Sequence, residues 1–123
     1  MTQEEKQLLL KDLCARLPYN VVVRCTDSDT DYNCFLTTDI LNEIQNGYEY
    51  YDYKPYLRPM SSMTDKEKTK IASMAGHFNS LTKSIEVCFA CLPVVDYCYS
   101  RHLDIHGLIE KGLALEAPES MYD

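Results

Sequence analysis

The sequence contains no tryptophan, no apolar run of membrane-spanning length, and no lysine or arginine between Cys25 and Tyr53. Its longest strongly apolar run, residues 87–95, is about half of the roughly 20 residues that a membrane helix needs, so a membrane anchor is not expected. The opening residues MTQEEKQLLLK carry two acids and only three consecutive leucines, which is not the pattern of a secretory signal. We therefore expect a cytoplasmic protein whose six cysteines are reduced, and we do not expect a Cys25–Cys34 disulfide.

The missing bases leave the middle of the chain strongly acidic. The formal net charge is −7, and residues 25–53 hold all of it, because the remaining 12 acids and 12 bases cancel. An acidic domain repels phosphate backbones, so binding to nucleic acid is disfavoured, whereas a basic protein partner or a divalent cation would match the charge. The seven acids of this stretch are Asp27, Asp29, Asp31, Asp39, Glu43, Glu49 and Asp52.

Composition and length indicate one ordinary globular domain. The chain has 123 residues, of which 46% are hydrophobic and 25% charged, so neither a disordered nor a fibrous class is indicated. We see no internal repeat or low-complexity tract. The expected organisation is a single domain over 1–123, with a helix and a sheet in 1–60 and mainly helices in 61–123.

Local patterns predict the elements of the first half. A capping box at Thr2–Glu5, followed by apolar residues at helical spacing, predicts a helix over 3–16. A β-branched run predicts a strand over 20–26, and a second strand is expected to begin near Asn33. Residues 38–45 fit a helical turn as well as a strand. Residues 48–57 resemble a long aromatic strand that Pro55 confines to an edge or a bulge.

The second half has helical signals. A second capping box, Thr64–Glu67, predicts a helix over 65–75, and a further helix is expected over 80–101, kinked or restarted by Pro93. Asp104 can cap a short turn that ends at Gly112. The predicted fold class is α+β: an N-terminal helix, a small bent antiparallel sheet of three to five strands that can curl towards a barrel, and a C-terminal helical subdomain.

Three strings carry a resemblance to a known group. They are LLLKDLCARLPY (8–19), KPYLRPMSSMTDKEK (54–68) and RHLDIHGLIEKGLALEAPESMYD (101–123), and together they cover roughly half of the chain. In these strings the sequence resembles small proteins of no assigned activity that recur in gut Bacteroidales genomes and in their phages and prophages. The resemblance implies a small cytoplasmic protein of mobile-element character, and it implies nothing about catalysis.

The stretch CTDSDTDYNC (25–34) resembles the first half of an EF-hand calcium loop. Asp27, Asp29 and Asp31 occupy positions 1, 3 and 5 of that loop. The glycine needed at position 6 and the glutamate needed at position 12 are replaced by Tyr32 and Thr38. We therefore expect a solvated loop between two strands, without bound calcium or any other metal.

A group of cysteines and histidines allows an enzymatic interpretation. Positions 88, 91, 95, 98 and 102 form one stripe on a continuous helix, too extended to converge on a zinc ion, so a buried cysteine stripe is the simpler interpretation. His102 and His106, with Asp104 between them, could form a pair of imidazoles, or His102 could cap the C-terminus of the preceding helix. The alternative function is thus a metal-assisted or thiol-dependent enzyme centred on Cys98, His102, Asp104 and His106.

The tyrosine-rich strand next to the acids gives the leading functional hypothesis. Strand propensity alone, a protein interface, and stacking of nucleic-acid bases could each explain the tyrosines, and the charge disfavours the last. We expect a non-enzymatic cytoplasmic interaction protein that needs no cofactor and binds a basic protein partner. The predicted partner-binding residues are Asp39, Glu43, Tyr48, Glu49, Tyr50, Tyr51, Asp52 and Tyr53.

Overall fold

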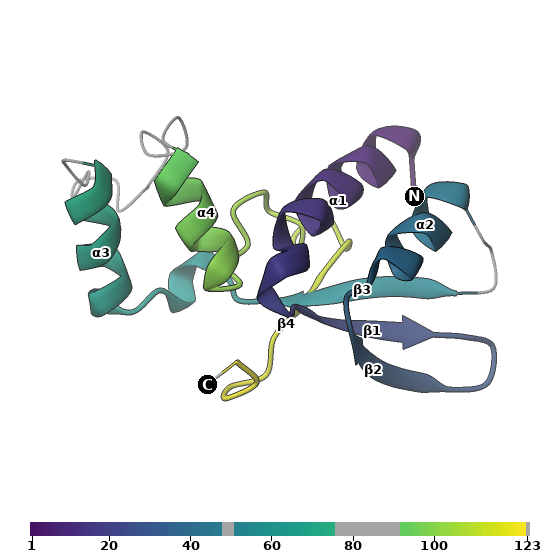
Figure 1. Ribbon diagram of the computed structural model, residues 1–123. Helices are drawn as coiled ribbons and strands as arrows, with labels where there is room; N and C mark the ends of the chain where they lie inside the picture. Colours follow the sequence, from purple (N-terminus) through teal and green to yellow (C-terminus); the bar gives the residue numbers. More distant parts are fainter. Residues whose placement is uncertain (48–50, 76–91, 123) are drawn as a thin grey trace.

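The computed structural model describes residues 1–47, 51–75 and 92–122 (Figure 1). Its fold class is α+β, as predicted. The elements follow one another as α1 (Gln3–Arg16), η1 (Leu17–Tyr19), β1 (Val22–Thr26), β2 (Asp31–Phe35), α2 (Thr38–Asn46), β3 (Asp52–Leu57), η2 (Met60–Ser62), α3 (Asp65–Ala75), α4 (Leu92–Ser100) and β4 (Leu115–Glu116). None of the helices in these ranges is long and apolar enough to span a membrane.

The predicted capping box starts α1. The Thr2 hydroxyl accepts a hydrogen bond from the Glu5 amide at 3.1 Å, and the Glu5 carboxylate accepts one from the Thr2 amide at 2.9 Å. These bonds satisfy amide groups that a helix start leaves without intrahelical partners. The predicted helix over 3–16 is confirmed. Leu9 and Leu13 are buried on the side of α1 that faces the sheet.

The sheet has the strand order β2-β1-β3-β4 and is open. β1 pairs antiparallel with both β2 and β3, whereas β4 pairs parallel with β3. The sheet is therefore mixed, which corrects the expectation of an antiparallel sheet, and it does not close into a barrel. The parallel strand comes from the C-terminal segment, where Ala117 donates to the Leu57 carbonyl at 2.8 Å.

Residues 38–46, for which the sequence pattern allowed two structures, form the helix α2. The Thr37 hydroxyl accepts a hydrogen bond from the Ile40 amide and caps the helix start. Ile40 and Ile44 are one turn apart and both buried, so the helix packs on the sheet beside α1. Gly47 ends the helix with a φ of 69°, a left-handed conformation that glycine adopts without steric cost.

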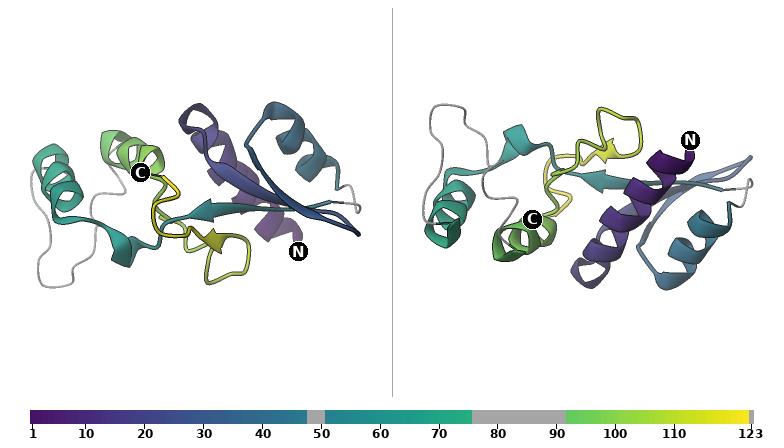
Figure 2. Two further views of the ribbon diagram at one scale, coloured as in Figure 1. Left: turned by 90° about the horizontal axis from the view of Figure 1, so that it is seen from below. Right: turned by 90° about the horizontal axis from the view of Figure 1, so that it is seen from above.

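The core consists of two apolar clusters. The larger one lies between the sheet and the helices α1 and α2, and it includes Leu108, Leu113 and Ala114 from the C-terminal segment. The smaller one joins α3 to α4 through Met63, Ile71, Val94, Cys98 and Leu103. Figure 2 shows these two helices side by side beyond one end of the sheet.

The sequence predicted two helices in the second half of the chain, over 65–75 and 80–101. The capping box at Thr64–Glu67 starts α3 as predicted, with bonds of 2.9 and 3.1 Å. Pro93 lies in the first turn of α4 (Leu92–Ser100). Gly76, Cys88, Cys91 and the first part of the helix expected over 80–101 lie outside the described residues.

A buried ion pair joins the first helix to the second half of the chain. Asp12 and Arg16 are both fully buried on α1, and the Arg16 guanidinium donates to the Asp12 carboxylate at 2.5 and 3.1 Å. The same guanidinium donates to the Leu103 carbonyl at 2.6 Å and lies 4.9 Å from the ring centre of Tyr99. The pair thus stabilises the contact between α1, α4 and the segment after α4.

Candidate functional site

The face of the sheet that α1 and α2 leave uncovered presents three cross-strand rows of side chains. Alternate residues of a strand point to opposite faces, so the residues opposite buried Val23, Cys25 and Tyr53 belong to this open face. Within the described ranges no helix covers it (Figures 1 and 2). The register gives a polar row Asn33–Arg24–Lys54 and an acidic row Asp31–Thr26–Asp52. Phe35 pairs with Val22, and Tyr56 continues this apolar row one position beyond the last paired residues of β1 and β3.

The acidic row brings together acids from two strands. Asp31 and Asp52 both pair with Thr26, one from each side, and both are exposed. Each has a tyrosine as its neighbour in the sequence, Tyr32 on β2 and Tyr51 before β3. By the same alternation these tyrosines belong to the other face, at the same end of the sheet, where Tyr32 pairs with Cys25 and Tyr51 stacks on Tyr53. These tyrosines are 49% and 41% exposed, so they are among the large hydrophobic side chains most accessible to solvent.

The loop between β1 and β2 adds two more acids next to this row. The Asp27 carboxylate accepts hydrogen bonds from the amides of Asp29 at 2.8 Å and Thr30 at 2.7 Å, and these bonds lower the pKa of Asp27. Asp27 therefore closes the turn that joins the strands, and Asp29 is exposed on it. We call this region the acidic end: Asp27, Asp29, Asp31, Tyr32, Tyr51 and Asp52.

The residues predicted to bind a partner are divided by the sheet. Asp52 lies on the open face, whereas Tyr53 is buried against the helices and donates a hydrogen bond to the Glu43 carboxylate of α2. The rings of Tyr51 and Tyr53 stack with centroids 5.9 Å apart. Tyr53 is thus a core residue that supports Tyr51. Asp39 is exposed in the first turn of α2, and Tyr48, Glu49 and Tyr50 lie outside the described residues.

Sequence reasoning missed Tyr32 and the two bases of the open face. Arg24 and Lys54 are paired in register one row away from the acids. The Arg24 Nε is buried and makes no hydrogen bond with the described residues. The alternation of residues along 20–26 and 51–57 could have placed both bases on the face of Asp52. Tyr32 required the register of β2, which no local pattern gives.

The four residues of the enzymatic alternative, Cys98, His102, Asp104 and His106, each contact different partners in the fold. Cys98 is fully buried in the smaller apolar cluster, and the Asp104 carboxylate accepts hydrogen bonds from the amides of Leu108 at 2.8 Å and Ile109 at 3.0 Å. The two histidines lie after the end of α4 rather than on one helical face. Among the described residues, no three His, Cys, Asp or Glu side chains are grouped as a metal site requires.

His102 and His106 each have a ring partner of their own. The His102 ring stacks on that of Tyr122 with centroids 3.7 Å apart, and burial lowers the pKa of His102 to about 4. The His106 Nε2 lies 2.8 Å from the Tyr99 hydroxyl and 3.9 Å from the Asp12 carboxylate. His102 follows α4 in a left-handed conformation, and its amide donates to the Tyr99 carbonyl. His102 therefore ends α4 through its backbone, at the helix C-terminus where it was expected to cap, while its ring stacks on Tyr122.

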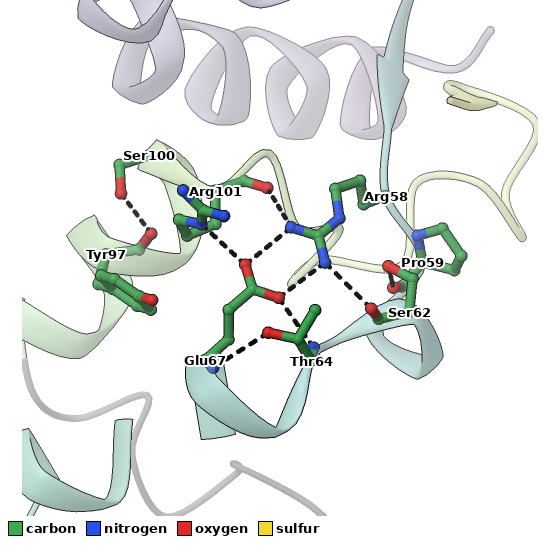
Figure 3. A network of polar contacts seen from close by, with 8 residues as sticks. All are labelled: Arg58, Pro59, Ser62, Thr64, Glu67, Tyr97, Ser100 and Arg101. Carbon is green, nitrogen blue, oxygen red and sulfur yellow. Dashed lines mark hydrogen bonds and ion pairs between the residues drawn. The ribbon is translucent and has the colours of Figure 1, made fainter. Parts of the chain in front are cut away.

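Two arginines meet one buried glutamate beyond the end of β3 (Figure 3). Glu67 accepts from Arg58 at 2.8 and 2.7 Å and from Arg101 at 2.8 Å. A neighbouring cavity of about 540 Å³ is lined by both arginines and by His102, but Glu116 and Glu119 line it as well. The carboxylates oppose an anionic ligand, so the arrangement acts as a clamp between β3, α3 and the end of α4.

Comparison of the chain with models of protein families, with curated proteins and with solved structures gave no match.

Proposed function

We propose that this protein is a non-enzymatic interaction protein that binds the basic surface of a protein partner through its acidic end. The observation that carries the proposal is the register at Thr26. It places Asp31 and Asp52 on either side of one residue on the open face, and the exposed Tyr32 and Tyr51 lie at the same end of the sheet on its other face. The sequence resemblance to proteins of gut Bacteroidales and their phages adds a phage or prophage accessory role in the cytoplasm to the proposal.

The chemistry of the acidic end favours a protein over a nucleic acid. Four carboxylates repel a phosphate backbone and attract lysine and arginine side chains. Tyrosine gives an interface a rigid contact area and is enriched among the residues that dominate binding energy. Tyr32 and Tyr51 thus supply apolar anchors, and the acids steer the encounter and fix its register.

The binding surface is tested by neutralising the two acids that flank Thr26. The variant Asp31→Asn/Asp52→Asn removes two charges from the acidic end. The control Glu110→Gln/Glu119→Gln removes two from exposed positions elsewhere. Each protein is used to capture partners from a lysate of a Bacteroidales host, with quantitative mass spectrometry of what is retained. We expect the first variant to lose a basic protein that the control and the wild type retain, while both variants keep the wild-type melting temperature.

Binding kinetics of the captured protein separate the two roles. Neutralising the acids should slow association by roughly tenfold at low salt, because charge steering acts on the encounter. Tyr32→Ala/Tyr51→Ala should leave association nearly unchanged and speed dissociation. Reversing Asp39 and Glu43 to lysine tests whether the surface extends onto α2. Wild-type kinetics in all of these folded variants would place the partner surface elsewhere.

A further inference from the structure

We propose that Cys25 and Cys34 form a thiol pair that closes reversibly to a disulfide by exchange with a low-molecular-mass disulfide such as oxidised glutathione. Their sulfur atoms lie 3.0 Å apart. Cys25 is on β1 and Cys34 on β2, its antiparallel neighbour. This site is independent of the proposed partner binding.

The register explains how the two sulfurs come close. Cys25 pairs with Tyr32 and Cys34 pairs with Val23, so the cysteines are diagonal neighbours on the face covered by the helices. Diagonal neighbours in a flat ladder have Cα atoms about 7 to 8 Å apart, and the twist of a sheet shortens one of the two diagonals. The separation of 3.0 Å indicates that the cysteines occupy the shorter one. Because a disulfide bond measures about 2.0 Å, the sulfurs must approach by about 1 Å.

The two thiols differ in their access to solvent. Cys25 is 1% exposed, whereas Cys34 is half-buried on the outermost strand of the sheet. A small disulfide can therefore reach Cys34 and not Cys25. Burial, and next the hydrogen bond with Cys34, raise the pKa of Cys25 to about 12. Since the thiolate is the attacking species, Cys25 is a poor first nucleophile because it is both inaccessible and held in its protonated form, and the first attack falls to the accessible Cys34.

The exchange takes two steps. In the first, the Cys34 thiolate attacks one sulfur of oxidised glutathione, forms a mixed disulfide and releases one glutathione thiolate. In the second, Cys25 gives its proton to water, its sulfur attacks Cys34, and the second glutathione leaves. Two protein thiols are oxidised, and one small disulfide is reduced to two thiols. Reduced glutathione drives the same steps backwards, so the bond is compatible with a compartment in which protein disulfides are transient.

Closing the bond changes how the edge strand is held. In the reduced protein β2 is joined to the sheet by its pairing with β1 on one side only. The disulfide would join the two strands covalently around the loop that carries Asp27 and Asp29. Such a cross-link restricts the unfolded chain and so raises the melting temperature.

The test uses the full chain with Cys14→Ser, because Cys14 is exposed and would join two molecules on oxidation. The protein is incubated with oxidised glutathione and alkylated. It is then digested with a protease that cleaves before aspartate, which separates the peptide of Cys25 from that of Cys34 at the intervening aspartates. We expect the two peptides to be joined, with the loss of two hydrogen atoms, and to separate again after reduced glutathione is added.

A second variant distinguishes closure from simple glutathione attachment. With Cys34→Ser, the Cys25 peptide should remain a free thiol that carries no glutathione, because Cys25 is buried. The oxidised parent protein should melt several degrees higher than the reduced one, and this difference should vanish in the variant. The proposal is overturned if Cys34 in the parent protein stops at the mixed disulfide, or if neither thiol reacts while the protein is folded.

Discussion

The guanidinium of Arg58 and the carboxylate of Glu67 face each other through two hydrogen bonds, which tie the end of β3 to the first turn of α3 (Figure 3). Glu67 is nearly inaccessible to solvent, and it also accepts a hydrogen bond from Arg101. The hydrogen bonds from Arg58 hold the pKa of Glu67 well below its usual range. The interaction therefore makes the position of the helical pair depend on one ionised carboxylate.

Replacing the Glu67 carboxylate should lower the free energy of unfolding and also reduce the dependence of that free energy on pH in acid. Glu67→Gln removes the charge that both arginines face, and we expect a loss of about 2 to 3 kcal/mol in the free energy of unfolding at pH 7. Because the folded pKa is lowered, this contribution is complete above the unfolded value of 4.5 and is lost as the pH falls below it. Urea unfolding at several pH values measures both effects. The exposed control Glu110→Gln should match the wild type, and an acid response unchanged by Glu67→Gln would contradict the assignment.

The buried pair of Asp12 and Arg16 predicts a strongly asymmetric mutational response. Asp12→Ala leaves the guanidinium of Arg16 buried without its counter-charge and should cost about 3 to 5 kcal/mol. Replacing both partners, as Asp12→Leu/Arg16→Met, should recover most of that loss because no charge then remains buried. Chemical denaturation of the three proteins checks this. Equal losses in the single and double variants would show that the pair does not act as a unit.

His102 should make the protein less stable in mild acid. Its folded pKa of about 4 lies below the unfolded value of 6.5, so the unfolded chain takes up a proton first as the pH falls. Stability is thus lost between pH 6.5 and 4. The full shift corresponds to about 3 kcal/mol, and solvent access to the half-buried ring reduces the expected loss to about 1 to 2 kcal/mol.

The variant His102→Asn isolates that contribution. Asparagine tolerates the left-handed backbone of this position, where φ is 63°, and it does not titrate. The difference in stability between wild type and variant should therefore shrink from pH 7 to pH 5. A difference that is constant over this range would show that the imidazole keeps the same protonation in the folded and the unfolded protein.

Tyr122 should stabilise the sheet through its hydroxyl group. That group accepts a hydrogen bond from the Val22 amide at 3.0 Å and donates one to the Tyr56 carbonyl at 2.6 Å. It thus bridges β1 and β3 at residues that face each other beyond the last paired positions. Tyr122→Phe keeps the ring on His102 and should cost about 1 to 3 kcal/mol, measured by thermal or urea unfolding. Tyr97→Phe is the matched control and should have a small effect.

Calcium should leave the stability of the protein unchanged. The Asp27 carboxylate already accepts hydrogen bonds from amides of its own loop, and Tyr32 and Thr38 replace the residues that an EF-hand needs. A ligand that binds only the folded state raises the melting temperature. Thermal unfolding with and without millimolar calcium should therefore give the same midpoint, and a reproducible rise would assign a cation to these aspartates.

Local chemistry explains why parts of the fold could be predicted. Both capping boxes are contained within four residues, and the structure has both. The alternation over residues 21–25 correctly predicted the buried face of β1, because Val23 and Cys25 on the strand and Val21 just before it are almost inaccessible. The parallel pairing of β4 had no such signal, since Leu115–Glu116 is only two residues long and its partner β3 is distant in the sequence.

The sequence predicted where the negative charge of the candidate site lies along the chain, and it did not predict which side chains share a face of the sheet. Counting acids located the charged stretch, but the count cannot separate the two faces of a strand, and Tyr53 proved to be buried while Asp52 is exposed. The approach of Cys25 to Cys34 likewise depends on the register and twist of two strands. The expectation that a reducing compartment keeps cysteines free does not depend on how close the two sulfur atoms lie.

The return of the C-terminal segment to β3 has a consequence for synthesis on the ribosome. Leu57 shares its apolar cluster with Leu108 and Leu113, which are translated about 50 residues later. At a translation rate of roughly 5 to 20 residues per second, the inner face of β3 stays uncovered for several seconds until Leu108 and Leu113 are synthesised. During that interval the border of β3 that later pairs with β4 is unprotected. The rate of translation between β3 and β4 therefore sets how long a chaperone, or another unfinished chain, has access to that border.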